Sequence, residues 1–215
     1  MSGRLPPSAS VATALEGRKM HAPAAERNAG ALCELLTRHA PAEGRALELA
    51  SGTGQHVTAF AKQLPALTWQ PSEVDNDRIA SIDAYVEEAG VENLKTAVML
   101  DATTPGWADL SRRWDMIVLV NLLHLISDKE ARCLIHEAVG ALAHCGRFIL
   151  YGPFMRSGRL TSDGDARFHA QLSASNPLIG YKDDTDVKAW LEGAGATHIA
   201  VEDMPANNLA FIATR

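Results

Sequence analysis

The stretch Leu47-Glu48-Leu49-Ala50-Ser51-Gly52-Thr53-Gly54-Gln55-His56 decides the fold class. Its apolar start belongs to a strand expected over Ala46–Ala50, and Gln55–Leu64 has the pattern of a helix. Gly52 and Gly54 between them permit positive φ angles and a close approach of the backbone to a ligand. A bare GxG turn can be purely structural, but ligands bind at this strand-to-helix turn in doubly wound sheets.

Acidic residues follow the next two expected strands, and they fit a nucleoside. Glu73 ends the strand Leu67–Glu73, 19 residues after Gly54, where a carboxylate can accept both hydroxyls of a ribose. Asp75 has the same role if that strand ends later. Asp101 ends Leu94–Leu100, and its carboxylate beside the backbone N–H of Ala102 can read the edge of an adenine ring. Each acid is alternatively a turn or helix cap.

The residue at position 57 argues against a nicotinamide dinucleotide. The third glycine of the dinucleotide fingerprint would fall at Val57, and a branched side chain there opposes close packing around a pyrophosphate. An NAD-type oxidoreductase is therefore the less favoured enzyme class.

Strands and helices alternate along most of the chain, which predicts a doubly wound, mostly parallel α/β sheet. A helix over Ala24–Thr37 precedes the first strand. Trp114–Val120 is apolar almost throughout, as a strand buried on both faces should be. The remaining expected elements are helices over Asn76–Glu88, Asp128–Ala143 and Asp184–Gly193, and strands over Arg147–Tyr151, Thr197–Glu202 and Leu209–Thr214.

Two segments fall outside this alternation. Residues 1–20 are expected to form a flexible N-terminal arm, ahead of a single domain over residues 21–215. Residues 154–183 are long and polar, with one helical candidate at Ala166–Ser175. A connection of that length inside a compact domain is usually functional, so it is expected to be a substrate-side insertion.

Composition excludes several classes of protein. The chain has 215 residues, with 20 basic and 26 acidic side chains and a net charge of −6, so nucleic acid is not an expected partner. No run of apolar residues is long enough to span a membrane. Three cysteines without CxxC spacing favour a reducing cytoplasm, and histidines without HxH or HxxxH pairs predict no metal site. The sequence leaves a homodimer open.

Acids at the ends of successive strands, with a GxG turn after the first, resemble the class I S-adenosylmethionine-dependent methyltransferases. The resemblance extends to the domain-of-unknown-function 938 family, which includes the methyltransferase-like 26 proteins of animals and many bacterial members. It covers about Met20 to Arg215. The segments that carry it are His21–Asn28, Ala50–His56, Leu67–Ser72, Tyr151–Phe154, Asn176-Pro177 and Met204–Asn208.

This resemblance implies a Rossmann-like class I methyltransferase fold with a seven-stranded sheet and an N-terminal helical cover. It implies S-adenosylmethionine as the cofactor, with Arg27 or Asn28 meeting the methionine carboxylate. It also places Asn207 and Asn208 in a substrate wall. The expected cofactor-binding set is Arg27, Asn28, Glu48, Ala50, Gly52, Gly54, Glu73, Asp75, Asp101, Ala102 and Asn121.

The chain departs from the resembling families at three places. Ala50 stands where most class I enzymes have the first glycine of the loop, and Glu73 stands where the family more often has Asp. Phe168-His169 replaces an expected Phe-Asp in the presumed substrate region. The acceptor should therefore not be carried over from relatives.

Methyl transfer from a sulfonium is an in-line displacement, so the protein mainly has to hold an aligned acceptor in a dry site. Asn121 follows the buried strand and is expected at the methionine end, with His124 positioning or deprotonating the acceptor. Tyr151 ends a central strand and points toward the same place. His56 either faces the pocket or packs in the core.

The expected function is thus an S-adenosylmethionine-dependent methyltransferase acting on a small-molecule acceptor, with the methylated O, N or S atom left open. The alternative from a different class is a catalytically inactive module that binds adenosylmethionine or adenosylhomocysteine. Expected catalytic residues are His124, Tyr151 and Asn121. The expected substrate-binding residues are His56, Tyr151, Asn207 and Asn208.

Overall fold

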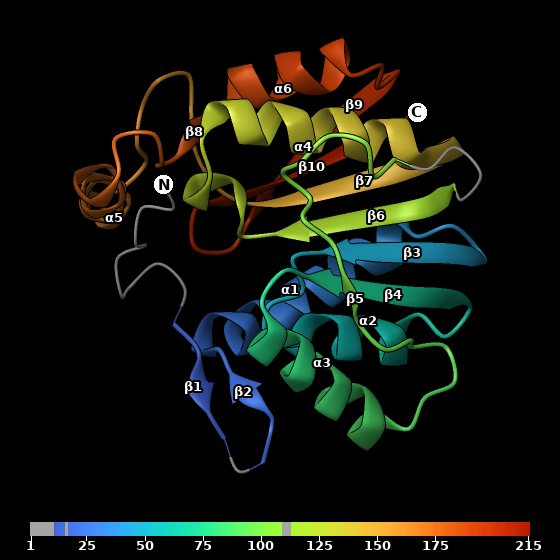
Figure 1. Ribbon diagram of the computed structural model, residues 1–215. Coiled ribbons are helices and arrows are strands. Elements are labelled where there is room, and N and C mark those ends of the chain that lie inside the picture. Colours follow the sequence, from blue (N-terminus) through green and yellow to red (C-terminus); the bar gives the residue numbers. More distant parts are fainter. Residues whose placement is uncertain (1–10, 16, 109–112) are drawn as a thin grey trace.

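A central sheet organises the chain, and helices cover both of its faces (Figure 1). The structure is a computed structural model that describes residues 11–15, 17–108 and 113–215. Seven strands lie in the order β5-β4-β3-β6-β7-β10-β9. They span Gly44–Leu49 (β3), Leu67–Glu73 (β4), Val98–Met99 (β5), Trp114–Val120 (β6), Leu142–Met155 (β7), His198–Met204 (β9) and Asn208–Thr214 (β10).

The sheet is mainly parallel, as the alternation of elements predicts. β3 pairs in parallel with β4 and β6, β4 with β5, and β6 with β7. β10 is antiparallel to both β7 and β9. An additional strand, Lys182–Asp183 (β8), pairs with Phe154 and Met155 of β7. The described part of this sheet therefore has eight strands, and the expected count of seven is wrong by this short addition.

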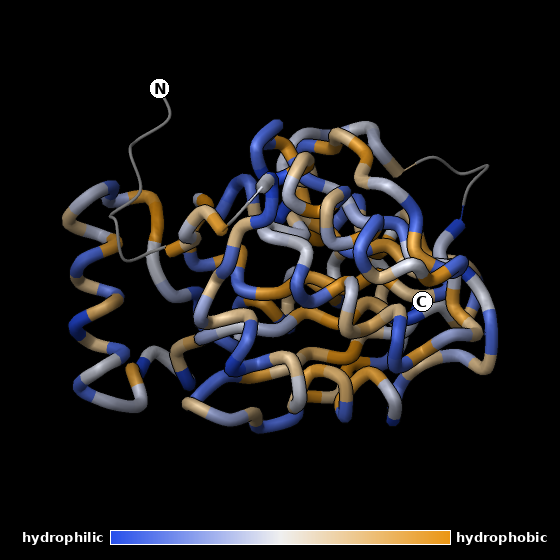
Figure 2. The backbone as a smooth tube through the Cα atoms, turned by 90° about the horizontal axis from the view of Figure 1, so that it is seen from below, coloured by the Kyte–Doolittle hydropathy of each residue, from blue (hydrophilic) through white to orange (hydrophobic). Residues whose placement is uncertain are grey.

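The helices divide between the two faces of the sheet (Figure 1). One face carries α1 (Pro23–His39), α2 (Gln55–Gln63) and α3 (Asn76–Ala89), and the other carries α4 (Asp128–Ala141) and α6 (Asp184–Gly193). A short 3-10 turn, η1 (Leu123–Leu125), links β6 to α4. The helix α5 (Asp163–Ser175) lies to one side of the sheet, beyond the carboxyl end of β6 (Figure 1), and it stands apart from the other helices in Figure 2.

Alternation of side chains along the central strands builds two hydrophobic cores. In β6, Ile117 and Leu119 face α4 and α6, whereas Met116 and Val118 face α1, α2 and α3. All four side chains are buried, because helices cover both faces of this strand. The carboxyl ends of β3, β4 and β6 consequently open toward the same edge of the sheet.

Two expected strands differ most from the structure in their bounds, and side chains explain the shorter one. The strand expected over Leu94–Leu100 is reduced to Val98–Met99. The Gln70 amide donates to the Thr96 carbonyl and the Asp83 carboxylate accepts from the Ala97 N–H, so side chains occupy backbone groups that a strand would use. The strand expected from Arg147 to Tyr151 instead extends over Leu142–Met155, because α4 ends at Ala141.

The start of the described chain is a small hairpin packed beside α3 (Figure 1). Its strands Thr13–Ala14 (β1) and Met20–His21 (β2) pair in antiparallel fashion. Residues 1–10 and 16 of the expected arm lie outside the described residues. Pro23 then occupies the first turn of α1, where its missing N–H costs no hydrogen bond.

The segment 154–183 contains α5 and returns to the strand from which it leaves. Ser162 caps α5 by accepting from the Asp165 N–H, so the helix begins before the expected Ala166. Its small hydrophobic core contains Leu172, Ile179 and Tyr181, packed against Leu125 and Phe168. The segment is thus attached to the sheet through η1 and β8.

Candidate functional site

The glycine loop after β3 has a left-handed backbone at three alternate positions. The φ angles are 51° at Ala50, 60° at Gly52 and 92° at Gly54. A Cβ at Gly54 would lie 2.8 Å from the Ile82 Cα, so this glycine is required for the close packing of α2 on α3. A Cβ at Gly52 would meet only the Arg78 guanidinium, at 3.7 Å. Gly52 therefore leaves its backbone open to a ligand.

The loop borders a cavity of about 430 Å³ at the carboxyl ends of the parallel strands. That volume falls within the range of small-molecule sites. Seven of the expected site residues line it: Arg27, Glu48, Ala50, Gly52, His56, Glu73 and Asn121. These seven residues therefore come together at one cavity, at the turn where ligands bind in this type of sheet.

The Glu73 carboxylate is fixed by two backbone amides at the floor of this cavity. Its Oε2 accepts from the Gly52 N–H at 2.9 Å, and its Oε1 accepts from the Val74 N–H at 2.8 Å. The side chain is 5% exposed. Each oxygen retains a further lone pair, so the carboxylate is oriented and can still accept hydrogen bonds from a ligand.

Two buried polar groups on the cavity wall lack partners. The Oε2 of Glu48 and the Nε2 of His56 have no hydrogen-bond partner among the described residues, although both side chains are more than nine-tenths buried. Burial raises the pKa of Glu48 to about 8, with a smaller contribution from the charge of Glu73. Burial lowers the pKa of His56 to about 4, opposed by a hydrogen bond with the Ala25 backbone. Unpaired buried groups are costly, and both belong to side chains of this cavity.

The other acids expected to bind the nucleoside serve as caps in this structure. Asp75 is the N-cap of α3 and accepts from the Arg78 N–H at 3.0 Å. Asp101 forms a turn in which one oxygen accepts from the N–H and the hydroxyl of Thr103, at 2.9 and 2.6 Å. Neither Asp101 nor the buried Ala102 lines the cavity, and the same holds for Asn28, Gly54 and Asp75. Both Asp positions correspond to the capping alternative.

Of the three expected catalytic residues, only Asn121 reaches the cavity. Asn121 has a φ of 57°, and its N–H donates to the Tyr151 carbonyl at 2.9 Å. Tyr151 itself is 3% exposed and packs in the core beneath α1 and α2, because alternation along β7 turns it to that face. Burial raises the pKa of Tyr151 to about 12.

His124 is buried beside the α5 segment and does not line the cavity. Its ring packs edge-on against Phe168 and Tyr181, with centroids 5.7 and 6.2 Å away. Burial, together with the charge of Lys182, lowers the pKa of His124 to about 3. The η1 turn instead presents Leu122 and Leu125 to the cavity. A side chain in this environment is unsuited to act as a base near neutral pH.

Asn207 and Asn208 lie in the hairpin between β9 and β10, away from the cavity walls. Ala206 and Asn207 have φ angles of 58° and 61°, the pair of left-handed residues that a tight hairpin turn requires. The Asn207 amide donates to Asp165 of α5 at 3.2 Å. Asn207 therefore joins the hairpin to α5, whereas the Asn208 amide donates to the Pro205 carbonyl within the hairpin at 2.8 Å.

Several cavity-lining residues carry no signal that the sequence analysis used. Val11 and Ala12 precede the N-terminal hairpin, Thr53 lies between the two glycines, and Arg78 lies on α3. Thr53 lies inside the glycine motif, and its place between the two glycines is the signal that could have found it. Val11, Ala12 and Arg78 reach the cavity only through packing of the hairpin and α3 on the loop.

A second hollow of about 600 Å³ lies between the start of α4 and residues 177–182. Lys182 on its wall is buried and already bound: its ammonium donates to the Ile126 carbonyl at 2.8 Å and pairs with Asp128 at 3.0 Å. The cavity at the glycine loop is the stronger candidate because its buried polar groups lack partners.

The described residues 11–15, 17–108 and 113–215 contain no group of three or more His, Cys, Asp or Glu side chains that could hold a metal ion. Across the same residues, every helix is too short or too polar to cross a membrane.

The fold is shared with known methyltransferases. An O-methyltransferase family protein from Burkholderia thailandensis matches with a TM-score of 0.72 and 17% identity, over 89% of this chain and 59% of that one. A putative O-methyltransferase from Nostoc punctiforme matches with a TM-score of 0.75 and 18% identity, over 88% and 56%. Human N-acetylserotonin methyltransferase, solved with S-adenosylmethionine, matches with a TM-score of 0.66 and 13% identity, over 89% and 55%. This chain spans less than two thirds of each of these proteins.

These similarities show that the chain has the Rossmann-like fold that these methyltransferases share. Within it, the chain belongs to the DUF938 family, described as proteins of unknown function, whose model matches residues 19–215.

Proposed function

We propose that this chain is an S-adenosylmethionine-dependent methyltransferase acting on a small-molecule acceptor. The observation that carries the proposal is the cavity at the glycine loop, where an oriented carboxylate and two unpaired buried polar groups meet at the ends of the parallel strands. The fold shared with methyltransferases supports it, and human N-acetylserotonin methyltransferase was solved with this cofactor.

The residues present suit the cofactor in both chemistry and position. Glu73 would accept the ribose hydroxyls, and Gly52 leaves room for the ligand to lie against its backbone. Arg27 would pair with the methionine carboxylate. The unpaired atoms of Glu48 and His56 would receive hydrogen bonds from the ammonium, which suits acceptors buried in a cavity. Asp101 caps a turn and does not line this cavity, and the adenine edge is kept as its proposed ligand through its remaining lone pairs.

Bound adenosylmethionine supplies an electrophilic methyl group on a sulfonium. The chain's own part is to align an acceptor and exclude water. Leu122 and Leu125 of the η1 region, with Val11 and Pro23 on the N-terminal side, form an apolar part of the wall suited to an uncharged small molecule. We propose that the start of α1, which contributes to this wall, is the N-terminal helical cover.

The location and partners of the chain are also part of the proposal: a reducing compartment, and no nucleic acid. The cysteines Cys33, Cys133 and Cys145 are free, which suits a reducing compartment such as the cytoplasm. The net charge of −6 gives no general attraction to nucleic acid.

Calorimetric titration of the chain with adenosylmethionine, adenosylhomocysteine and NAD tests the cofactor. We expect saturable binding of the first two ligands and none of NAD. Incubation with labelled adenosylmethionine and a panel of small thiols, phenols and amines then separates an enzyme from a binding module. Failure of both sulfur ligands to bind the folded chain would overturn the proposal.

A further inference from the structure

The N-terminal segment forms one wall of the cavity, although it lies outside the glycine-loop motif. Val11 and Ala12 line the cavity, as do Ala22 to Ala25 and Arg27. Most of these residues have small side chains, so the wall is formed mainly by the path of the backbone. The contacts that hold this segment in place therefore set the shape of the cavity.

Two hydrogen-bonded routes connect this wall to Thr53 of the glycine loop. In the first, the Gln55 Oε1 accepts from the Ala22 N–H at 2.6 Å and from the Thr53 hydroxyl at 2.9 Å. In the second, the Ser81 hydroxyl accepts from the Met20 N–H and donates to the Thr53 carbonyl, both at 2.8 Å. Thr53 is 4% exposed and lines the cavity.

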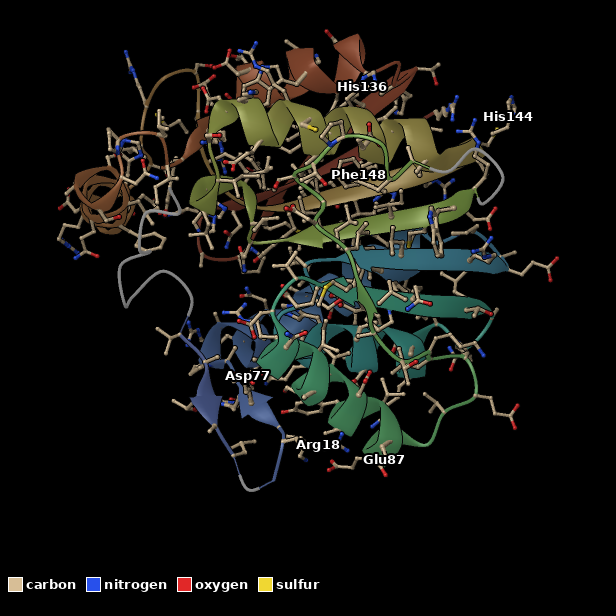
Figure 3. All side chains as sticks on the ribbon, viewed as in Figure 1. Arg18, Asp77, Glu87, His136, His144 and Phe148 are labelled. Carbon is tan, nitrogen blue, oxygen red and sulfur yellow. The ribbon has the colours of Figure 1, made fainter. Side chains whose placement is uncertain are left out.

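A further part-buried bond, from the Tyr85 hydroxyl to the Met20 carbonyl at 3.1 Å, ties the hairpin to α3, whereas its ion pairs with α3 are exposed and contribute less. Arg18 pairs with Glu87 at 2.9 Å near the end of α3 (Figure 3), and Lys19 pairs with Glu88. Exposed ion pairs of this kind contribute little to stability, because solvent screens the charges. The buried and part-buried bonds at Gln55 and Ser81 are therefore the contacts that link the wall to the glycine loop.

We propose that Gln55 and Ser81 are positioning residues that couple the N-terminal wall to the glycine loop. Binding of the cofactor by the loop and closure of the wall over the cavity would then occur together. The inference rests on the proposed function, because the cofactor is what the loop would hold. Gln55 is the sharper case, since a single oxygen receives one hydrogen from the wall and one from the loop. Coupling of this kind is reciprocal: a ligand that orders the loop also orders the wall.

Two substitutions at Gln55 distinguish the effect of its acceptor oxygen from the effect of its size. Gln55→Met keeps the length of the side chain and removes the acceptor, whereas Gln55→Glu retains an acceptor oxygen at the start of α2. Two quantities are measured for each variant and for the wild type. They are the Kd of adenosylhomocysteine by calorimetry, and the hydrogen exchange of residues 20–25 with and without that ligand.

For Gln55→Met we expect a Kd about tenfold weaker and loss of the slowing of exchange that adenosylhomocysteine causes at residues 20–25. Gln55→Glu should behave as the wild type in both measurements. Arg18→Ala is the matched control, since it removes an exposed contact of the same hairpin and should leave the Kd unchanged. Circular dichroism and the Tm verify that each variant is folded.

The outcomes separate the two proposals. If the wild type binds adenosylhomocysteine and Gln55→Met binds it equally well with the same exchange protection, the coupling inference is wrong and the proposed function stands. Equal losses in Gln55→Met and Gln55→Glu would also contradict it, because the acceptor oxygen would then not matter. If the wild type binds no adenosylhomocysteine, the proposed function fails, and the inference fails with it.

Discussion

The glycine-loop side of the site and the α5 side differ in how well the expected residues come together. At the ends of β3 and β4, Glu48, Gly52 and Glu73 converge on one cavity. The other expected residues are dispersed: His124 is buried beside α5, Tyr151 packs under α1 and α2, and Asn207 lies in the turn before Asn208 begins β10. The first region is built from consecutive residues of a strand, turn and helix, whereas the second depends on contacts between distant segments.

This difference shows which kind of site residue a linear motif can locate. In the loop, the backbone angles of a few neighbouring residues determine where the side chains lie. Beside η1, the direction of each side chain depends on which residues of α5 and β8 pack against it. The comparison can be tested on both sides, beginning with the change expected to have the largest effect.

Glu73→Ala should weaken adenosylhomocysteine binding about 10- to 100-fold, because it removes a charged acceptor for ligand hydroxyls and the partner of the Gly52 N–H. Asp75→Ala is the control, since it removes only the N-cap of α3 and should lower stability by about 1 kcal/mol with little effect on affinity. Calorimetry measures both variants. Normal binding by Glu73→Ala would remove the distinction between the two regions.

Glu48→Gln should change how stability depends on pH. The pKa of Glu48 is raised from 4.5 to about 8, so the folded chain holds this proton more tightly than the unfolded chain. Its contribution to stability is fully present below pH 4.5 and is lost as the pH rises through 8. As the pH rises from 5 to 8, the Tm of the variant should decrease less than the Tm of the wild type. Glu43→Gln, on the exposed surface, should follow the wild type, and identical curves for all three chains would show that Glu48 is not the group responsible.

His124→Phe tests the α5 side through the stability of the chain at acid pH. Burial lowers the pKa of His124 from 6.5 to about 3, so its contribution to stability is present above pH 6.5 and is lost as the pH falls toward 3. The variant should therefore resist acid unfolding better than the wild type, and the exposed His136→Gln should not. Adenosylhomocysteine affinity should stay within about twofold. Once an acceptor is known, loss of turnover with a shifted pH profile in His124→Phe would restore the base role.

Ala50→Gly should have the smallest effect, a stabilisation of up to about 1 kcal/mol. Ala50 has a φ of 51°, which costs a non-glycine residue about 1–2 kcal/mol, and the greater freedom of glycine in the unfolded chain offsets part of the gain. Ala46→Gly, in the regular part of β3, should instead destabilise. Thermal unfolding compares the two, and a lower Tm for Ala50→Gly would indicate that the loop is unstrained.

Much of the fold was predictable because hydrophobic periodicity is local. The almost wholly apolar run Trp114–Val120 predicted its strand, and the alternation of strands and helices predicted a mainly parallel sheet. The two-residue strand β8 was not predictable, since Lys182 and Asp183 pair with residues of β7 that lie on the far side of α5 in the sequence. The reduction of β5 likewise depends on Gln70 and Asp83, which come from other elements.

The residues of the candidate site were predictable where their positions follow directly from the ends of strands and the turns after them. Glu73 followed from its position at the end of β4, and Gly52 from the turn after β3. Tyr151 could have been assigned to the core, because it shares its side of β7 with the buried Ile149, two residues earlier. The burial of His124 could not, because Phe168 and Tyr181 are more than forty residues further along the chain.

The return of β8 to β7 has a consequence for how members of this family can diverge. Phe154 and Met155 pair with Lys182 and Asp183, so the ends of the intervening segment are held side by side. Lengthening a loop with fixed ends costs only about 0.6 kcal/mol for each doubling of its length. The segment between these strands can therefore be exchanged, extended or shortened during evolution while the sheet and the glycine loop keep their geometry. In an engineered chimera, the junctions would be placed at these paired residues.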